Sequence, residues 1–245
     1  MFLLEGGNVF KDAKGQPLTQ RIAKGNVVPT VQWLEQLTGL NLVDNMLGTT
    51  GRAETSGDLD LGVDATKISK DVLVQQLLKR GIDAKDIRKS GDAVHLKTPI
   101  LGDSNNGYVQ TDFMFTDNPT WQAFALTGGA AGSQFKGMHR HVLLSSIAKA
   151  QNLKWSPKFG LLDRTTNEVI STDPTELAIK LLGPGHTAKD ITTVESVIKA
   201  IKGRPDFEAL VKDAKEAFEK DNLVLPESSP LPGTGAWYRQ FTDMR

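Results

Sequence analysis

The clearest pattern along the chain is the strict alternation of apolar and polar residues over residues 58–64, which read DLDLGVD. A period of two residues is typical of a β-strand whose apolar side chains share one buried face. Residues 108–115 alternate in the same way and predict a second strand, with Asp112 on the side opposite its apolar neighbours. A shorter strand is expected at 93–96.

Apolar residues at helical spacing surround these strands. We expect one helix to open at Pro29 and to stop at Gly39, and Ser69 to cap a second helix that runs through Arg80. Four later helices are predicted at 137–150, 174–182, 190–202 and 205–221, and a hairpin is predicted at 163–170. This order of elements predicts an α+β fold, in which helices cover a small mixed sheet.

The bulk composition is that of a globular chain and restricts the kind of partner. The 245 residues are 39% hydrophobic and 24% charged, and 29 Lys and Arg balance 29 Asp and Glu. Proteins that wrap nucleic acid usually carry a positive excess, so the whole chain does not imply extensive non-specific DNA binding. The chain contains no cysteine, which excludes disulfides and thiolate metal sites.

Neither a membrane partner nor export is indicated. No apolar run approaches the roughly 18 residues needed to span a bilayer. The N-terminus lacks the basic and apolar regions of a signal peptide. We therefore expect a cytoplasmic protein, or one in the host cytoplasm if the chain is viral.

One stretch of the chain, residues 133–158, carries basic residues and no acid. It is either a local basic patch or an ordinary solvated helix face. Its basic residues and histidines are Lys136, His139, Arg140, His141, Lys149, Lys154 and Lys158. The four histidines of the chain have no ligand spacing with one another or with a carboxylate, so each is expected to be structural or at the surface.

Asp58 and Asp60 give the most specific chemical signal. Residues i and i+2 of a strand point to the same side, so their carboxylates should lie next to each other. Each raises the cost of ionising the other, and a divalent cation removes that cost. Mg²⁺ prefers such hard oxygen ligands. If the strand with Asp112 is adjacent, three acids converge, which is enough to hold two metal ions for phosphoryl transfer.

The connector before Asp58 is rich in glycine and hydroxyl residues. Such a loop can present backbone N–H groups and hydroxyls to phosphate oxygens. Arg52 is the natural partner of a triphosphate, because its guanidinium matches phosphate geometry. An isolated Asp-x-Asp is usually a surface turn, but this connector and a later strand Asp together favour a nucleotide site. The expected phosphate contacts are Gly48, Thr49, Arg52, Ser56 and Gly57.

These motifs resemble the signature of the DNA polymerase β nucleotidyltransferase superfamily. The matching residues are Leu47-Gly48-Thr49, then Asp58-Leu59-Asp60, then Asp112. The run from Arg52 to Asp60 is closest to the family X DNA polymerases, although one residue is missing, so Arg52 maps only approximately onto the family's triphosphate-binding Arg. The chain also resembles compact bacteriophage-encoded transferases.

The resemblance covers about residues 47–182 and implies a domain order. A nucleotidyltransferase palm is expected at 30–117 and a helical thumb-like subdomain at 118–182. A short N-terminal segment, 1–29, precedes the palm, and a helical extension with a tail, 183–245, follows the thumb-like part. The N-terminal DNA-binding domain of the family X polymerases has no counterpart.

The resemblance also implies substrate contacts beyond the palm. Thr127 and Gly128 are similar to an element that bends beneath the incoming nucleotide. Lys136 corresponds to a residue near the nucleotide base, and Arg140 to one that contacts the template. Ala125-Leu126 replaces the family's Tyr-Phe pair, which puts its discrimination of the ribose in doubt.

The implied activity is transfer of a nucleoside monophosphate from an NTP or dNTP to an acceptor hydroxyl, with release of pyrophosphate. Two Mg²⁺ ions, for which Mn²⁺ can substitute, would be held by Asp58, Asp60 and Asp112. One expectation is a small DNA polymerase that acts on primer-template ends or gapped DNA. The alternative is a transferase that modifies RNA, a protein or a small molecule. A third possibility is an inactive binding module on the same fold.

Overall fold

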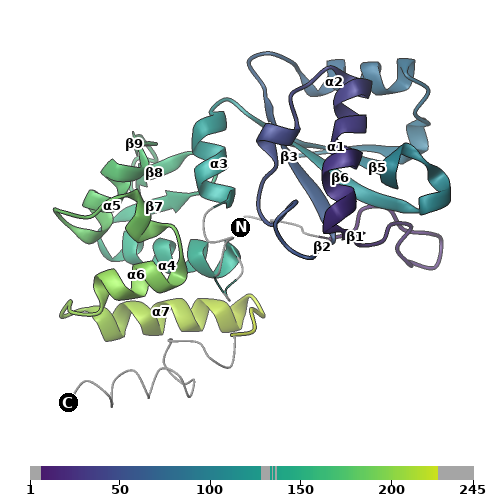
Figure 1. The fold of residues 1–245 in the computed structure, drawn as a ribbon. Helices are drawn as coiled ribbons and strands as arrows, with labels where there is room; N and C mark the ends of the chain where they lie inside the picture. Colours follow the sequence, from purple (N-terminus) through teal and green to yellow (C-terminus); the bar gives the residue numbers. More distant parts are fainter. Residues whose placement is uncertain (1–6, 128–132, 134, 136, 226–245) are drawn as a thin grey trace. The chain divides into compact units, whose positions relative to one another are not determined.

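The computed structural model describes residues 7–127, 133, 135 and 137–225 (Figure 1). The chain divides into two compact units, one that ends at Pro119 and one that starts at Thr120. The first unit contains a four-stranded sheet, and the second is mainly helical with a small sheet. The chain therefore has a mixed α+β fold, as the alternating and helical patterns predicted.

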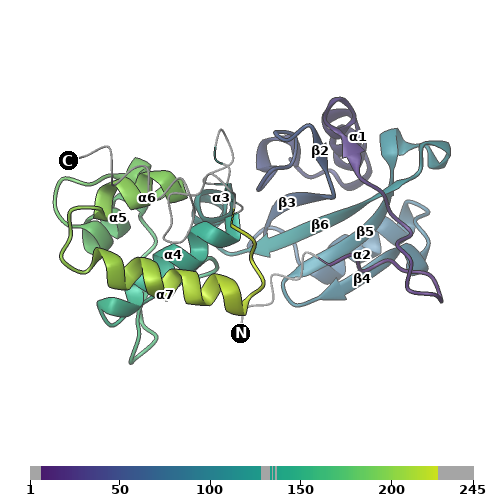
Figure 2. The same ribbon diagram turned by 90° about the horizontal axis from the view of Figure 1, so that it is seen from below.

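The first unit is built on a sheet with the strand order β3-β6-β5-β4, which can be followed in Figure 2. Strand β3 runs parallel to β6, whereas β5 is antiparallel to both β6 and β4. The strands have the bounds β3 Asp58–Asp64, β4 Ile87–Ser90, β5 Ala93–Pro99 and β6 Tyr108–Thr116. Both alternating segments of the sequence are therefore strands, and they are neighbours.

Two helices, α1 (Lys24–Thr38) and α2 (Lys70–Lys79), bury the apolar face of this sheet. Leu59 and Leu61 of β3 are completely buried in the shared core. The predicted cap of α2 is confirmed, because Ser69 Oγ accepts a hydrogen bond from the N–H of Val72. Burial of the apolar face against two helices leaves the polar face of the sheet for the acids.

Helix α1 begins at Lys24, five residues before the start predicted from Pro29. Proline normally marks the first turn of a helix because it has no N–H to donate. Here Pro29 and Gly25, the residue whose carbonyl would accept that bond, are both exposed, so water can replace the missing donor. Val27 is buried in the core and favours the longer helix.

The segment before α1, which the sequence left unplaced, lies against the polar face of the sheet. We call residues 7–20 the N-terminal strap. The N–H of Val9 donates to Gln110 Oε1 at 2.9 Å, and the N–H of Gln20 donates to the carbonyl of Tyr108 at 2.8 Å. Phe10 is buried, with the guanidinium of Arg88 5.9 Å from its ring centre. The strap therefore covers part of the face that carries the acids.

Two short strands follow the strap and fix the connector before β3. Strand β1 (Ile22–Ala23) pairs with β2 (Thr55–Ser56) in antiparallel register. Ile22 is buried in the core of the first unit. This pairing places the start of the chain beside the residues that lead into β3.

The second unit has one hydrophobic core, which takes residues from Trp121 to Phe218. Helices expected in a separate C-terminal extension therefore share a core with those expected in the thumb-like part. The helices are α3 Pro119–Thr127, α4 Gly137–Ala150, α5 Pro174–Leu182, α6 Val194–Ile201 and α7 Phe207–Lys220. The sheet consists of β7 Leu153–Ser156, β8 Gly160–Asp163 and β9 Val169–Ser171.

Short 3₁₀ helices join these elements. Their bounds are η1 Val43–Asn45, η2 Ala84–Asp86, η3 Ile100–Gly102, η4 Ser104–Asn106 and η5 Ala188–Ile191. Within the described part of the chain, none of the helices combines the length and apolar character needed to cross a membrane.

Candidate metal centre

The sheet brings Asp58, Asp60 and Asp112 together on its polar face. Asp58 and Asp60 are two residues apart on β3, and Asp60 lies directly opposite Asp112 on the parallel neighbour β6. One carboxylate oxygen from each of the three lies within 4.8 Å of the other two. Among the described residues, this is the only group of three or more such side chains close enough to hold a metal.

The electrostatics of the cluster show what the crowding does. Burial, followed by the charges of Asp58 and Asp112, raises the pKa of Asp60 to about 8. Burial and the charge of Asp112 also raise the pKa of Asp58, although a backbone hydrogen bond and Arg21 act in the opposite direction. At neutral pH Asp60 is therefore largely protonated unless a cation offsets the repulsion.

The residues present fit a hard divalent cation such as Mg²⁺ or Mn²⁺. Three carboxylates are oxygen ligands of the kind that Mg²⁺ prefers, and their mutual repulsion is relieved by positive charge. A nearby hydroxyl also lacks a partner: Ser56 is 3% exposed, and its Oγ has no hydrogen bond in the described part of the chain. A buried hydroxyl without a partner is costly, so a ligand that reaches it would be stabilised.

The glycine-rich connector lies next to the acids, as the nucleotide-site hypothesis requires. The N–H of Leu47 donates to the carbonyl of Asp60 at 2.8 Å, and Thr50 Oγ1 accepts from the N–H of Asp60 at 3.0 Å. These two bonds fix the turn at Gly48-Thr49 beside the second acid. Gly48 has a φ of 58°, a conformation that favours glycine.

The expected phosphate contacts of this connector are only partly exposed. Thr49, Arg52 and Gly57 are exposed, whereas Ser56 is buried in the pairing with β1. A guanidinium nitrogen of Arg52 lies 3.4 Å from the carbonyl of Gly48, so its side chain folds back over its own loop. Exposed Thr49 and Arg52 beside buried acids form a surface that suits phosphate oxygens.

Arg21 is a cation of this site that the sequence did not indicate. Its guanidinium donates to Oγ1 and to the carbonyl of Thr55, both at 3.0 Å, and its charge lowers the pKa of Asp58. A guanidinium nitrogen lies 3.2 Å from the position that a Cβ on Gly57 would take. The residue lies in a weakly patterned segment, and only the β1–β2 pairing brings it to the connector.

His95 and Gln110 were also missed as residues of the site. His95 Nδ1 lies 2.7 Å from Asp112 Oδ1, and Gln110 Nε2 donates to the same oxygen at 3.0 Å. His95 is directly opposite Asp112 in the antiparallel β5–β6 pair. No pattern in the sequence indicated this carboxylate partner for His95, because the partner lies across the sheet and not at a fixed spacing in sequence.

The remaining predicted site residues belong to the second unit, and the position of Arg140 differs from what the resemblance implies. Thr127 is the last residue of α3, and Gly128 and Lys136 lie outside the described residues. Arg140 is only 2% exposed. Its guanidinium donates to the backbone carbonyls of Ile191 at 2.9 Å and of Ala125 and Phe124 at 3.2 Å.

Arg140 thus differs from the expected template contact, because it lies in the interior and binds the backbone of two elements, α3 and η5. Burial lowers its pKa to about 10, which leaves it cationic at neutral pH. His139 and His141 on the same helix are buried too, and burial lowers the pKa of His141 to about 3. These three residues are buried, so they form neither a local basic patch nor a solvated helix face, the two interpretations that the sequence left open.

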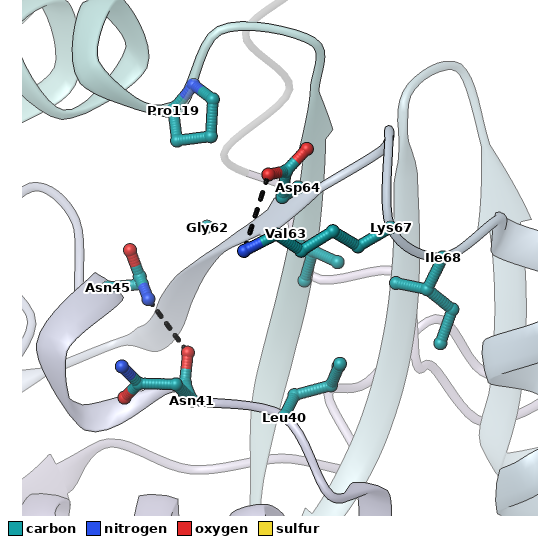
Figure 3. A pocket seen from close by; sticks show the side chains of 9 residues that line it. All are labelled: Leu40, Asn41, Asn45, Gly62, Val63, Asp64, Lys67, Ile68 and Pro119. Carbon is teal, nitrogen blue, oxygen red and sulfur yellow. Dashed lines mark hydrogen bonds and ion pairs between the residues drawn. The ribbon is translucent and has the colours of Figure 1, made fainter.

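A separate cavity lies at the far end of β3 from the acids. It has a volume of about 210 Å³, and Asp64 and Lys67 in its wall pair with each other at 3.9 Å (Figure 3). Asn41 and Asn45 lie across from them and are joined by a hydrogen bond of 2.8 Å. The cavity therefore belongs to a different part of the sheet from the carboxylate cluster.

No model of a known protein family matches the sequence, and no curated protein matches it. The resemblance to the nucleotidyltransferase superfamily therefore depends on the motifs and on the geometry just described.

The interior position of Arg140 predicts a structural role. Arg140→Met should lower the free energy of unfolding by about 3 kcal/mol or more, because two buried carbonyls and one partly buried carbonyl lose their donor. Urea unfolding measures this difference. Lys149→Met on the same helix removes only an exposed pair with Asp213 and should cost less than about 1 kcal/mol. Equal losses in the two variants would contradict the assignment.

The raised pKa of Asp60 predicts how stability depends on pH in metal-free protein. The folded state keeps a proton that the unfolded state, with the ordinary pKa of 3.8, has already released. Asp60 should therefore contribute a fall in stability as pH rises from about 4 to about 8, whereas buried His141, whose pKa is lowered to about 3, contributes a rise with pH up to about 6.5. The difference in stability between wild type and Asp60→Asn, from thermal melts with EDTA, isolates the Asp60 contribution. It should fall between about pH 4 and about pH 8, whereas the difference for Asp64→Asn on the same strand should stay flat. A difference for Asp60→Asn that does not fall over this range would refute the electrostatic argument.

Proposed function

We propose that this chain is a metal-dependent nucleotidyltransferase, which moves a nucleoside monophosphate from an NTP or dNTP to an acceptor hydroxyl and releases pyrophosphate. The observation that carries this proposal is the convergence of Asp58, Asp60 and Asp112 from two adjacent strands. A turn with exposed hydroxyl and guanidinium groups beside them supports it. An acid cluster alone would serve many metal sites, but an acid cluster beside a phosphate-binding turn favours nucleotide chemistry.

Each residue group has a distinct role in this proposal. Asp58 and Asp60 would hold the Mg²⁺ or Mn²⁺ that accompanies the triphosphate, and Asp112 would share a second ion with them. Bound metal supplies positive charge at the phosphate oxygens and lowers the pKa of the acceptor hydroxyl. The protein itself mainly orients the reacting groups and supplies fixed charge.

The phosphates would lie along the connector between α1 and β3. The backbone of Gly48 and the hydroxyl of Thr49 can donate hydrogen bonds to phosphate oxygens. Arg52 and Arg21 are exposed cations that contact this connector. Their guanidinium groups match the geometry of phosphate oxygens. In this proposal the first unit acts as the palm, and Thr127, Gly128 and Lys136 remain predicted nucleotide contacts.

Two kinds of acceptor remain for the proposed transfer. A primer end or a short gap in DNA follows from the resemblance to family X DNA polymerases. An RNA, a protein or a small molecule is favoured by the burial of Arg140, His139 and His141, which removes three groups from the expected basic stretch. The formal net charge of zero supports the second kind as well.

The decisive experiment incubates the protein and labelled nucleotides with primed, gapped and single-stranded DNA and with RNA, in Mg²⁺ and in Mn²⁺. We expect metal-dependent labelling of one acceptor together with pyrophosphate release. If DNA is the acceptor, binding should weaken steeply with salt as counterions are released. Labelling of RNA or of the protein itself would identify the second kind of acceptor. The proposal is rejected if no acceptor is labelled and nucleotide binding does not depend on metal.

The three carboxylates should be individually necessary for transfer. Asp58→Asn, Asp60→Asn and Asp112→Asn should each reduce kcat by at least about a hundredfold. Each substitution removes a ligand of the metal ions that would stabilise negative charge in the transition state. Asp112→Asn should leave the KM for nucleotide within a few-fold of wild type. Thermal melting of Asp58→Asn and Asp60→Asn without metal should show equal or higher stability, because the crowding of carboxylates is reduced.

Asp64→Asn is the matched control for these variants. Asp64 lies on the same strand, but its carboxylate is bound to the N–H and hydroxyl of Thr66, at 2.9 and 2.6 Å. Its removal should leave kcat within about twofold of wild type, a change too small to reflect lost transition-state binding. Wild-type activity in any of the three carboxylate variants would eliminate the proposed site.

A further inference from the structure

Asp112 is held by donors from two side chains, one on its own strand and one across the sheet. His95 Nδ1 lies 2.7 Å from Asp112 Oδ1. Gln110 Nε2 donates to the same Oδ1 at 3.0 Å and to Oδ2 at 3.3 Å. All three side chains are buried, with His95 7% and Asp112 8% exposed. The carboxylate therefore has a fixed orientation before any ligand arrives.

The direction of each hydrogen bond follows from the chemistry of the groups. As a metal ligand Asp112 would be an ionised carboxylate, which only accepts, so in that state His95 Nδ1 and Gln110 Nε2 both donate. The amide of Gln110 cannot be reversed, because its Oε1 accepts from the N–H of Val9 at 2.9 Å. With Nδ1 carrying the proton, His95 Nε2 can accept from Ser90 Oγ, which lies 2.9 Å away. The network thus joins β4, β5, β6 and the N-terminal strap through one carboxylate.

The two oxygens of Asp112 are used unequally in this network. Oδ1 takes both of the short bonds, at 2.7 and 3.0 Å, whereas among the described residues Oδ2 has only the longer contact at 3.3 Å. Oδ2 therefore keeps most of its capacity to accept. Without the donors on Oδ1, repulsion from Asp58 and Asp60 would favour rotation of the Asp112 side chain away from them.

We propose that His95 is a positioning residue for the candidate metal centre: with Gln110 it holds Asp112 Oδ1, so that Oδ2 is the oxygen presented to a divalent cation. This inference rests on the metal site of the proposed function. His95 does not act as a ligand itself, because its ring nitrogens face Asp112 and Ser90. Partners of this kind orient metal ligands, and their loss typically weakens metal binding about 10- to 100-fold.

The test uses Mn²⁺ alone as the probe, with free Mn²⁺ measured by electron paramagnetic resonance in the absence of nucleotide. His95→Leu should weaken Mn²⁺ binding by about 10-fold or more, because Oδ1 loses its shorter bond. His95→Asn should stay within about threefold of wild type, since the amide nitrogen of Asn can take the position of Nδ1. His95→Gln, whose amide nitrogen instead reaches toward Ser90, should behave like His95→Leu.

Thr98→Val is the matched control for loosening of the sheet. Thr98 lies on the same strand as His95, is completely buried, and its Oγ1 bonds across to Thr111 Oγ1 on β6 at 2.7 Å. That bond joins the same two strands on the face toward the helices. Its loss should leave Mn²⁺ affinity within about twofold of wild type, because it does not touch a metal ligand.

A double-variant cycle separates positioning from a general effect on folding. If His95 acts through Asp112, His95→Leu should have no further effect on Mn²⁺ affinity in an Asp112→Asn background. In the transfer assay His95→Leu should lower kcat and leave the KM for nucleotide within a few-fold, whereas His95→Asn should restore most of kcat.

The outcomes distinguish this inference from the proposed function. Mn²⁺ binding that depends on His95, without transfer to any acceptor, would remove the function and keep the positioning role. Active wild type with unchanged Mn²⁺ affinity and kcat in His95→Leu would overturn the positioning role alone. If His95→Leu fails to fold, the Mn²⁺ affinities of His95→Asn and His95→Gln are compared instead. Equal losses of affinity in these two variants overturn the inference. Absence of Mn²⁺ binding to the wild type overturns it as well.

Discussion

The crowding of three carboxylates, two partly buried and one buried, on one face of a four-stranded sheet is the constraint on which the rest of the first unit depends. Burial and the charges of Asp58 and Asp112 raise the pKa of Asp60 to about 8, so ionising all three acids costs free energy. The opposite face offsets this cost, because Leu59, Leu61 and Phe113 are completely buried beneath α1 and α2. Apolar packing on one side thus keeps in place an unfavourable arrangement of charge on the other, as is common at functional sites.

The part of this arrangement that could be predicted is the part that is local in sequence. Period-two alternation correctly predicted the strands at 58–64 and 108–115 and the side on which Asp112 lies. Their parallel pairing, by contrast, depends on contacts between residues that are distant in sequence. The pattern of each strand alone therefore could not predict that the two strands are neighbours. His95 and Arg21 could not be found for the same reason, because each reaches the acids only through strand pairing.

The errors have physical causes as well. Proline rules placed the start of α1 too late, since an exposed Pro29 inside a helix loses only a bond that water can replace. Charge patterning misplaced Arg140, because a buried guanidinium that binds three backbone carbonyls looks in sequence like any surface cation. Both cases show tertiary contacts outweighing a local preference.

The parallel pairing of β3 with β6 also bears on the order in which the chain folds. Strands β4, β5 and β6 follow one another along the chain and form an antiparallel meander, whereas β3 joins β6 only by closing a loop of about fifty residues. Pairings between distant segments form slowly, and local ones form early. The carboxylates of β3 therefore meet Asp112 in the same late step that buries Leu59 and Leu61 of β3, so the apolar burial that opposes their repulsion arrives together with it.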